Sequence, residues 1–464
     1  MNRKVYAFWS VLVAAAAFRL WQSFFVVPPH VGDCLHLQIQ GTAVINDVPQ
    51  LSASAQILVA RVIEAHALNG LSCGGDYTLR LKTKLYPRFA YNDTILFSGR
   101  LSSPYNFSSA DGRTFDLRGY LAKDDIFYQI LGAQVTPADA TIMRTVASSP
   151  SIGIFGRTIN SISTALFSLR RSFVGNLNAA LGEPHAALAA GLVVGEKSAL
   201  GSDLLNDFRT VGLIHIVVLS GYNITIVGDA MRRLLSFLPR VWGILIGGIG
   251  ILLFGVMVGG GATVVRSCIM ATIALSAAVI RRDYSVVRAL AFAALLMLIE
   301  NPLILLHDPS FQLSFLATLG LILLAAPIER RLSFIPDAFG MRGVVAATLA
   351  TQVFVSPYIL YMMGQLSIIG VVVNILVLPL IPATMVAVFV TGLAGFALPI
   401  LSWLAGMAAH LLLSYELFMV MNFARLPFAA IHVDTFPFAY VAVFYAAFFA
   451  GYVIVVFRRR SSSH

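Results

Sequence analysis

Charged side chains are scarce in this sequence: Asp, Glu, Lys and Arg make up 12% of its 464 residues, and apolar residues make up 58%. Soluble domains carry about 25% charged residues, so the composition excludes an ordinary soluble protein. Several stretches reach the roughly 20 apolar residues that are needed to cross a bilayer. The sequence therefore predicts a polytopic α-helical membrane protein with about nine spans after residue 212.

Catalytic and metal-binding motifs are missing as well. The nine histidines form no H-x-H-x-D-H or H-E-x-x-H cluster, so we expect no metal site. The string GLVVGEKS (191–198) lacks the spacing of a phosphate-binding loop, and Ser220 stands outside a G-x-S-x-G motif. Carboxylates are few in the apolar stretches, which disfavours a proton-driven carrier. We expect neither an enzyme nor a cofactor.

Cysteine is rare, with three in the chain. Cys34 and Cys73 fall in a polar segment that we expect to be exported, whereas Cys268 lies in an apolar stretch. An oxidising compartment permits a disulfide. The sequence leaves a Cys34–Cys73 bridge and two free thiols equally open.

The positive charge, +10 in total, gathers in one set of loops. Hydropathy places the following basic residues on one side of the membrane: Arg3, Lys4, Arg232, Arg233, Arg240, Arg281, Arg282, Arg288, Arg330, Arg331, Arg342 and Arg458 to Arg460. The opposite short loops hold only Arg425. The positive-inside rule makes the first set cytoplasmic, together with both termini. Residues 1–29 are then a retained anchor in the cytoplasmic membrane, and residues 30–150 lie outside it.

The polar segment 30–150 alternates apolar and polar residues between turn-forming strings, which predicts a small β domain of about five strands. Its clearest strand places four residues on one face: Arg80, Lys82, Lys84 and Tyr86. A basic face with an aromatic ring could bind a phosphate backbone and a stacked base. A solvated outer face is the alternative, and the near balance of basic and acidic residues in the segment favours it.

Residues 151–185 contain apolar side chains at three- and four-residue steps from Phe155 to Leu181, with polar residues between them. This pattern predicts an amphipathic helix that is too polar to span the membrane. Such a helix could lie in the outer membrane interface. It could equally well pack against the membrane domain, which we assign to residues 186–464.

The stretch GLIHIVVLSGYNITIV (212–227) sets His215, Ser220, Gly221 and Asn223 into an apolar run. His215 and Ser220 would face different sides of a continuous helix, so they line a common site only if the helix is interrupted, and Ser220-Gly221 is a plausible place. The interruption would suit a water-filled path. A buried polar pair that ties neighbouring helices together is the alternative.

Two other features also indicate a path through the membrane. Pro379 and Pro382 stand near the middle of the apolar segment 368–398, which predicts a broken helix beside a cavity. Arg266 lies inside an apolar stretch, where a charge usually marks a pathway or a buried partner, although it could also extend to the membrane surface.

Several polar residues in the apolar stretches are further candidates for this path. They are Asp308, Gln312, Ser314, Gln352 and Asn374. Asp308 precedes Pro309, and this pair is typical of an ordinary helix start, with a cap followed by the first turn. We favour that structural interpretation for Asp308.

Five ordered blocks point to a known family. They are SSPYNFSSADGRTFDLRGYLAKDDIF, ALAAGLVVGEKSALGSDLLNDFRTVGLIHIVVLSGYNITIV, VVRSCIMA, DPSFQLSFLATLGL and GQLSIIGVVVNILVLPLIP. Together they resemble the ComEC competence proteins of bacteria, which form the inner-membrane conduit for transforming DNA. The resemblance implies an extracytoplasmic OB-fold domain, followed by a helical channel with broken or re-entrant helices.

The resemblance also implies that one DNA strand crosses the membrane, pulled by a separate cytosolic ATPase, and that a periplasmic or surface DNA receptor delivers it. It places seven residues at family positions of channel importance: His215, Ser220, Gly221, Arg266, Asp308, Gln312 and Ser314. Asn223 departs from the family, which has a histidine there. The chain ends without the metallo-β-lactamase-like domain of many relatives, so a separate nuclease is expected.

Two other functions remain open from the sequence. The chain could export or carry another polyanion or a lipid-linked substrate, or it could be a membrane scaffold that conducts nothing.

Overall fold

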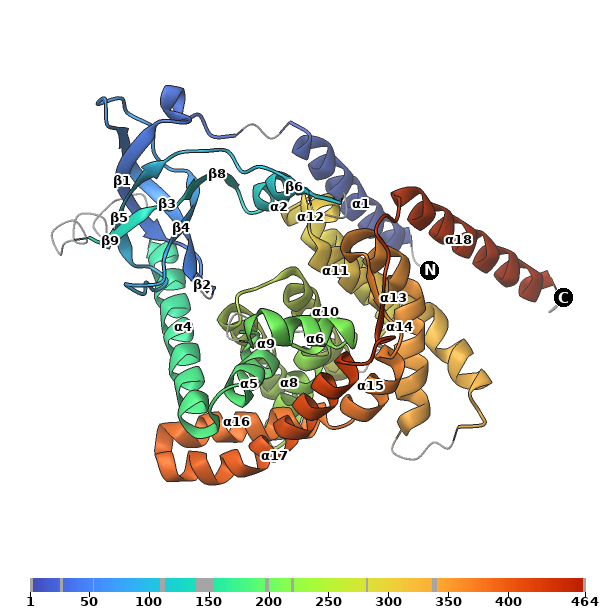
Figure 1. Cartoon of the computed structure of the whole chain (residues 1–464). Coiled ribbons are helices and arrows are strands. Elements are labelled where there is room, and N and C mark those ends of the chain that lie inside the picture. Colours follow the sequence, from blue (N-terminus) through green and yellow to red (C-terminus); the bar gives the residue numbers. More distant parts are fainter. Residues whose placement is uncertain are drawn as a thin grey trace.

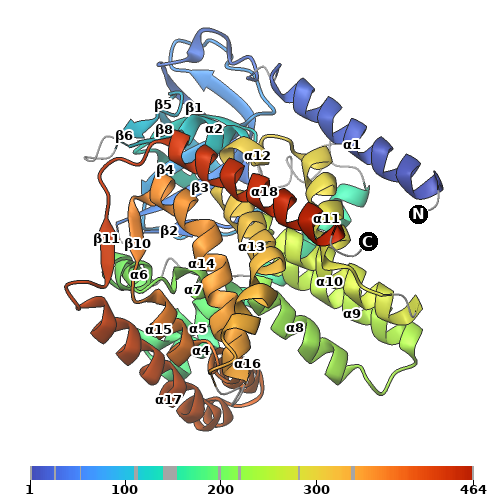
Figure 2. The same ribbon diagram turned by 90° about the vertical axis from the view of Figure 1, so that its right-hand side faces the viewer.

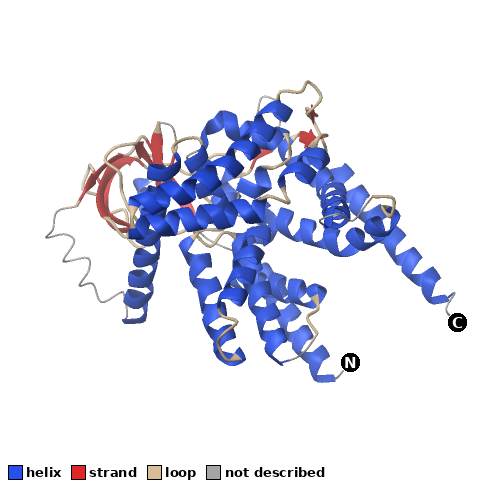
Figure 3. Ribbon diagram, turned by 90° about the horizontal axis from the view of Figure 1, so that it is seen from below, coloured by secondary structure: helices blue, strands red, loops and turns tan. Residues whose placement is uncertain are grey.

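The computed structural model describes residues 3–25, 28–52, 54–108, 113–138, 154–196, 200–217, 221–280, 283–335 and 340–461. Most strands gather at one end of the molecule, and helices form the remainder (Figure 3). Helix α4 descends from the sheet to the helices at the opposite end (Figure 1). The chain thus has an N-terminal β domain and a helical part, as the composition predicts.

The β domain is built on one sheet of seven strands with the order β8-β4-β3-β1-β5-β9, and β2 pairs with β3. The strands are β1 (Gln38–Ile45), β2 (Gln50–Leu51), β3 (Ala55–Ala67), β4 (Thr78–Lys84), β5 (Thr94–Arg100), β8 (Ile126–Leu131) and β9 (Gln134–Pro137). All pairs are antiparallel except β4 with β8. The sheet has more strands than the five or so expected, because β2 and β9 are too short to show an alternating pattern.

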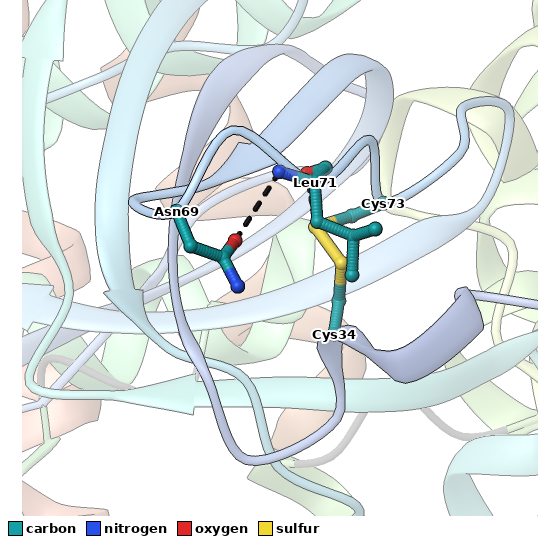
Figure 4. Close-up of a disulfide and its surroundings, with 4 residues drawn as sticks. All are labelled: Cys34, Asn69, Leu71 and Cys73. Atoms are coloured by element: carbon teal, nitrogen blue, oxygen red, sulfur yellow. Dashed lines mark hydrogen bonds between the residues drawn. A yellow bond between two sulfur atoms is a disulfide. The ribbon is translucent and has the colours of Figure 1, made fainter.

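The alternation in β4 folds as predicted. Leu79 and Leu81 are buried in the core of the sheet, whereas Lys82 and Lys84 are exposed on the other face. The same core holds both cysteines of the domain, which form the disulfide Cys34–Cys73 with a Cα–Cα distance of 5.6 Å (Figure 4). The bridge joins the short helix η1 (Gly32–Cys34) to the loop after β3.

Helix α4 (Ile154–Leu181) packs against the helical part with its apolar stripe. Phe173, Leu177 and Leu181 belong to the largest buried cluster of the helical part. The amide of Asn176 donates to the carbonyl of Gly392 at 3.1 Å. Of the two placements that the sequence leaves open, the structure therefore shows packing against the membrane domain.

The helical part contains fourteen helices from α5 to α18 among the described residues. They are α5 (His185–Val194), α6 (Gly201–Thr210), α7 (Ile214–Val217), α8 (Gly221–Leu234), α9 (Arg240–Met257), α10 (Ala262–Ile280), α11 (Val286–Glu300), α12 (Ile304–His307), α13 (Pro309–Arg331), α14 (Met341–Met363), α15 (Gly370–Val377), α16 (Ile381–Ala397), α17 (Pro399–Ala424) and α18 (Phe438–Ser461). A two-stranded antiparallel sheet pairs β10 (Gln365–Ser367) with β11 (Ala430–His432), and α15 to α17 lie between the two strands in the sequence.

Among the described residues, three helices are long and apolar enough to span a membrane, namely α13, α14 and α17, and the bent pair α15–α16 makes four. Helices α9, α10 and α18 are further apolar helices of 18, 19 and 24 residues. The expected number of about nine spans therefore stays a prediction. The predicted break at Pro379 and Pro382 is confirmed: α15 and α16 are bent by 52° there.

Helix α1 (Arg3–Ser23) lies along α11, where the rings of Phe8 and Phe292 stack at 6.4 Å. Arg19 donates to the carbonyls of Ile299 and Glu300, and so satisfies acceptors that α11 leaves free at its C-terminal end. The N-terminal end of α1 and the C-terminal end of α18 both lie away from the sheet (Figures 1 and 2).

Candidate functional site

A cavity of about 2970 Å³ is lined by residues of both the β domain and the helical part. Its wall includes residues of the sheet, of α4, and of α8, α10, α13, α14 and α15. Six of the predicted path residues line it: His215, Gly221, Arg266, Ser314, Gln352 and Asn374. The fold therefore gathers residues that are up to 159 positions apart in the sequence around one space.

Arg266 stands on the cavity wall at α10 and is 7% exposed. Its Nε donates to the hydroxyl of Ser314 on α13 at 2.6 Å, and its guanidinium lies over the ring of Phe315 at 5.9 Å. No carboxylate forms an ion pair with it among the described residues. A buried cation without an anionic partner favours an anion in the adjacent space.

Gly221 opens α8 directly beside this guanidinium. A Cβ at this position would lie 2.7 Å from Nη2 of Arg266 and 2.9 Å from Oγ of Ser267. Contacts this short do not occur, so the glycine provides the room in which Arg266 lies.

His215 is on α7, which ends at Val217, and α8 begins at Gly221. Ser220 and the two residues before it lie outside the described residues, so the predicted interruption at Ser220-Gly221 stays a prediction. Nδ1 of His215 lies 3.0 Å from the carbonyl of Gly212, which assigns a proton to that nitrogen. The imidazole lines the cavity.

Gln352 and Asn374 are two uncharged polar residues of the wall. Gln352 donates from Nε2 to the carbonyl of Ser367 at 2.9 Å. Asn374 lies on α15 just before the break, and its buried Oδ1 has no hydrogen-bond partner among the residues that the structure describes. The broken helix therefore borders a cavity, as the sequence predicts.

Three predicted path residues have structural roles and do not line the cavity within the described chain. Asn223 on α8 is 1% exposed and donates to the carbonyls of Leu192 on α5 and Ile216 on α7. It therefore ties neighbouring helices together, which is the alternative that the sequence left open. Gln312 donates to the carbonyls of Leu305 and Leu306 and accepts from Tyr358.

Asp308 is the N-cap of α13, as predicted. Its Oδ1 accepts from the backbone N–H groups of Ser310 and Phe311, and Pro309 begins the helix. The sequence did not reveal its second partner, Lys123, whose Nζ lies 3.5 Å from Oδ2. Burial alone would lower the pKa of Lys123, but its hydrogen bond to Asp124 and the charge of Asp308 raise the pKa, so it stays charged.

The basic strand of the β domain lies apart from the cavity. Lys82 and Lys84 are exposed, and Arg80 donates to Oε1 of Gln129 at 3.1 Å. Tyr86 follows the end of β4, is 67% exposed and lies under the guanidinium of Arg88. These four residues do not line the cavity, so the solvated outer face remains a sufficient interpretation of them.

The sequence analysis did not identify the aromatic residues of a short hairpin in the β domain, formed by β6 (Phe107–Ser108) and β7 (Thr114–Phe115). Phe107, Phe115 and Tyr120 line the cavity where it meets the β domain. The signal was present, because two phenylalanines flank a turn-forming string in NFSSADGRTF. No group of three or more His, Cys, Asp or Glu in the described chain is placed to hold a metal ion.

Comparison with known proteins gives two matches. Residues 192–458 match the family described as Competence protein. ComE operon protein 3 of Bacillus subtilis (strain 168) is 24% identical over 259 residues, which cover 51% of this chain and 31% of that protein. The chain thus spans less than a third of this relative's length. No solved structure matches.

Proposed function

Because the chain belongs to the competence protein family, we propose that it is the inner-membrane channel through which one strand of DNA enters the cytoplasm. A role in competence follows from the family itself. Conduction is the proposed step, and a separate ATPase and a separate nuclease would supply force and degradation. The chain itself acts without enzymatic chemistry in this proposal.

The extent of the cavity is the observation that carries this proposal. Its wall includes Asp47 and Phe115 of the β domain. The wall also includes Arg232 and Tyr284, which flank loops that the positive-inside rule makes cytoplasmic. A cavity bordered by residues that we expect on both sides of the membrane supports a path for a strand of phosphates, since phosphates cannot enter hydrocarbon unaccompanied.

Charge on the wall supports the choice of an anionic substrate. Seven arginines line the cavity: Arg88, Arg113, Arg170, Arg171, Arg209, Arg232 and Arg266. Four acidic residues line it, namely Asp47, Asp93, Glu196 and Asp229. A cavity with low-dielectric walls focuses the field of its charges and attracts the opposite sign. Arg266 lies within the apolar helix α10. We expect it to contact a phosphate of the strand.

The β domain is proposed as the part that receives the strand outside the membrane. Its single parallel pair, β4 with β8, beside antiparallel β3, β1 and β5 supports an OB-like assignment. The hydrogen-bonded order is open between β8 and β9, and OB folds are themselves partly open barrels. OB folds bind single strands on one face.

Charge reversal at Arg266 tests the proposal. A deletion strain complemented with Arg266→Glu should import labelled DNA about 10- to 1000-fold less than one complemented with the wild type. Arg118→Glu is the control, because Arg118 is exposed and does not line the cavity. Normal transformation of the deletion strain would contradict a role in uptake. Normal uptake by Arg266→Glu would instead favour a carrier of another polyanion.

A further inference from the structure

The β6–β7 hairpin places an aromatic row at the mouth of the cavity. Phe107 pairs with Phe115 across the hairpin, with ring centroids 5.3 Å apart and planes tilted by 34°. The ring of Phe115 lies 5.7 Å from that of Tyr120 on α2 (Leu117–Ala122). The ammonium of Lys123 lies 4.7 Å from the centre of the Tyr120 ring. All three rings line the cavity.

Arg113 holds this hairpin against the helical part. Its Nη2 donates to the carbonyl of Val433 at 3.1 Å, and its Nε donates to the carbonyl of Asp434 at 3.4 Å. A Cβ at Gly364 would lie 1.8 Å from Nη2, so only glycine admits the guanidinium there. Arg113 therefore attaches the β7 side of the hairpin to the segment that precedes α18.

The first ring of the row is open to the cavity. Phe107 is 51% exposed, whereas Phe115 and Tyr120 are partly buried behind it. Two arginines of the β domain, Arg88 and Arg113, also line this cavity. An exposed flat ring beside cations matches an unpaired nucleotide, which offers a flat base and an anionic phosphate.

We propose that Phe107, supported by Phe115 and Tyr120, is a stacking site for an unpaired base of the incoming strand. This proposal rests on the proposed function and adds the part of the substrate that the mouth recognises. Every base has a π-face, so the site would select single strands without selecting sequence. Bases in a duplex are already stacked on one another, so a duplex would gain nothing from this ring.

Two oligonucleotides of equal charge test the stacking site. The full chain in lipid nanodiscs would be titrated with labelled oligo(dT) of about 15 nucleotides and with an abasic strand of the same length. The wild type should bind oligo(dT) more tightly. Phe107→Ala should weaken oligo(dT) binding by roughly 5- to 100-fold, the value of one stacked base, and leave abasic binding unchanged. Phe107→Trp should restore the preference.

Tyr105→Ala is the matched control, because Tyr105 precedes the hairpin, is 62% exposed and does not line the cavity. It should bind both strands as the wild type does. Equal binding of the two strands by the wild type would overturn the proposal, as would an unchanged preference in Phe107→Ala. Lower membrane insertion of Phe107→Ala with the preference intact would make the ring a lipid or packing contact, which also overturns it.

Failure of this inference can be told from failure of the proposed function. If the deletion strain loses DNA uptake but Phe107→Ala imports and binds DNA normally, the result supports the channel role and contradicts the stacking site. If the deletion strain imports DNA normally, the channel role falls first.

Discussion

Nε of Arg266 on α10 donates to the hydroxyl of Ser314 on α13 at 2.6 Å. This bond holds a buried guanidinium on the cavity wall and joins two helices that each border the same space. The side chain is 7% exposed and packs against α13. Its position is therefore fixed by its neighbours, and changing a neighbour should change the function without removing the charge.

Gly221→Ala should displace this guanidinium. The added methyl group would lie 2.7 Å from Nη2 of Arg266, and overpacking of a buried site costs about 1–3 kcal/mol. We expect normal protein levels and DNA uptake reduced on the order of tenfold, because the charge moves from the site where it meets the strand. Transformation frequency, normalised to protein level by immunoblot, measures the effect.

The control is Gly228→Ala in the same helix. A Cβ there would meet only Cδ1 of Ile251 at 3.7 Å, an ordinary contact. Its uptake should match the wild type. If Gly221→Ala also transforms at the wild-type rate, the placement of Arg266 is not required for transport.

The bridge between Cys34 and Cys73 should stabilise the β domain. The two residues are 39 positions apart, and a loop of this length corresponds to roughly 3–4 kcal/mol of free energy of unfolding. Cys73→Ala should therefore lower the thermal midpoint of the purified chain in detergent. Reductant should lower the midpoint of the wild type and leave that of Cys73→Ala unchanged. Cys268→Ala serves as control, because Cys268 is a free thiol; equal reductant sensitivity in wild type and Cys73→Ala would contradict the stabilising role.

Features governed by local rules could be predicted from the sequence. The alternation in β4, the cap and first turn at Asp308-Pro309, and the break at Pro379 and Pro382 each depend on residues that are neighbours in the chain. The sequence allowed a disulfide between Cys34 and Cys73 but could not decide whether it forms, because pairing depends on the path of the chain between the two residues.

Features that depend on distant partners could not be predicted. The polarity of Asn223 is evident from the sequence, but its hydrogen bond to Leu192 requires knowledge of how α5 and α8 pack. Phe107 and Arg113 belong to a short hairpin whose importance comes from docking against Gly364 and Val433.

The pair formed by Lys123 and Asp308 should hold the β domain to the helical part. The exposed fractions of their side chains are 10% and 8%. Lys123→Met leaves Asp308 as a buried carboxylate without a cation and should cost about 3–5 kcal/mol of free energy of unfolding. Asp308→Asn should cost less, because Lys123 keeps Asp124 at 2.8 Å and asparagine caps a helix as well as aspartate does.

A double-mutant cycle separates the pair from the cap. Lys123→Met combined with Asp308→Asn should be more stable than Lys123→Met alone, because the second change removes the uncompensated charge. Asp308→Ala should cost about 1 kcal/mol more than Asp308→Asn, since it also removes the acceptor for the N–H groups of Ser310 and Phe311. Thermal midpoints of the full chain in one detergent rank the four variants. Additive losses in the double variant would show that the two charges do not interact.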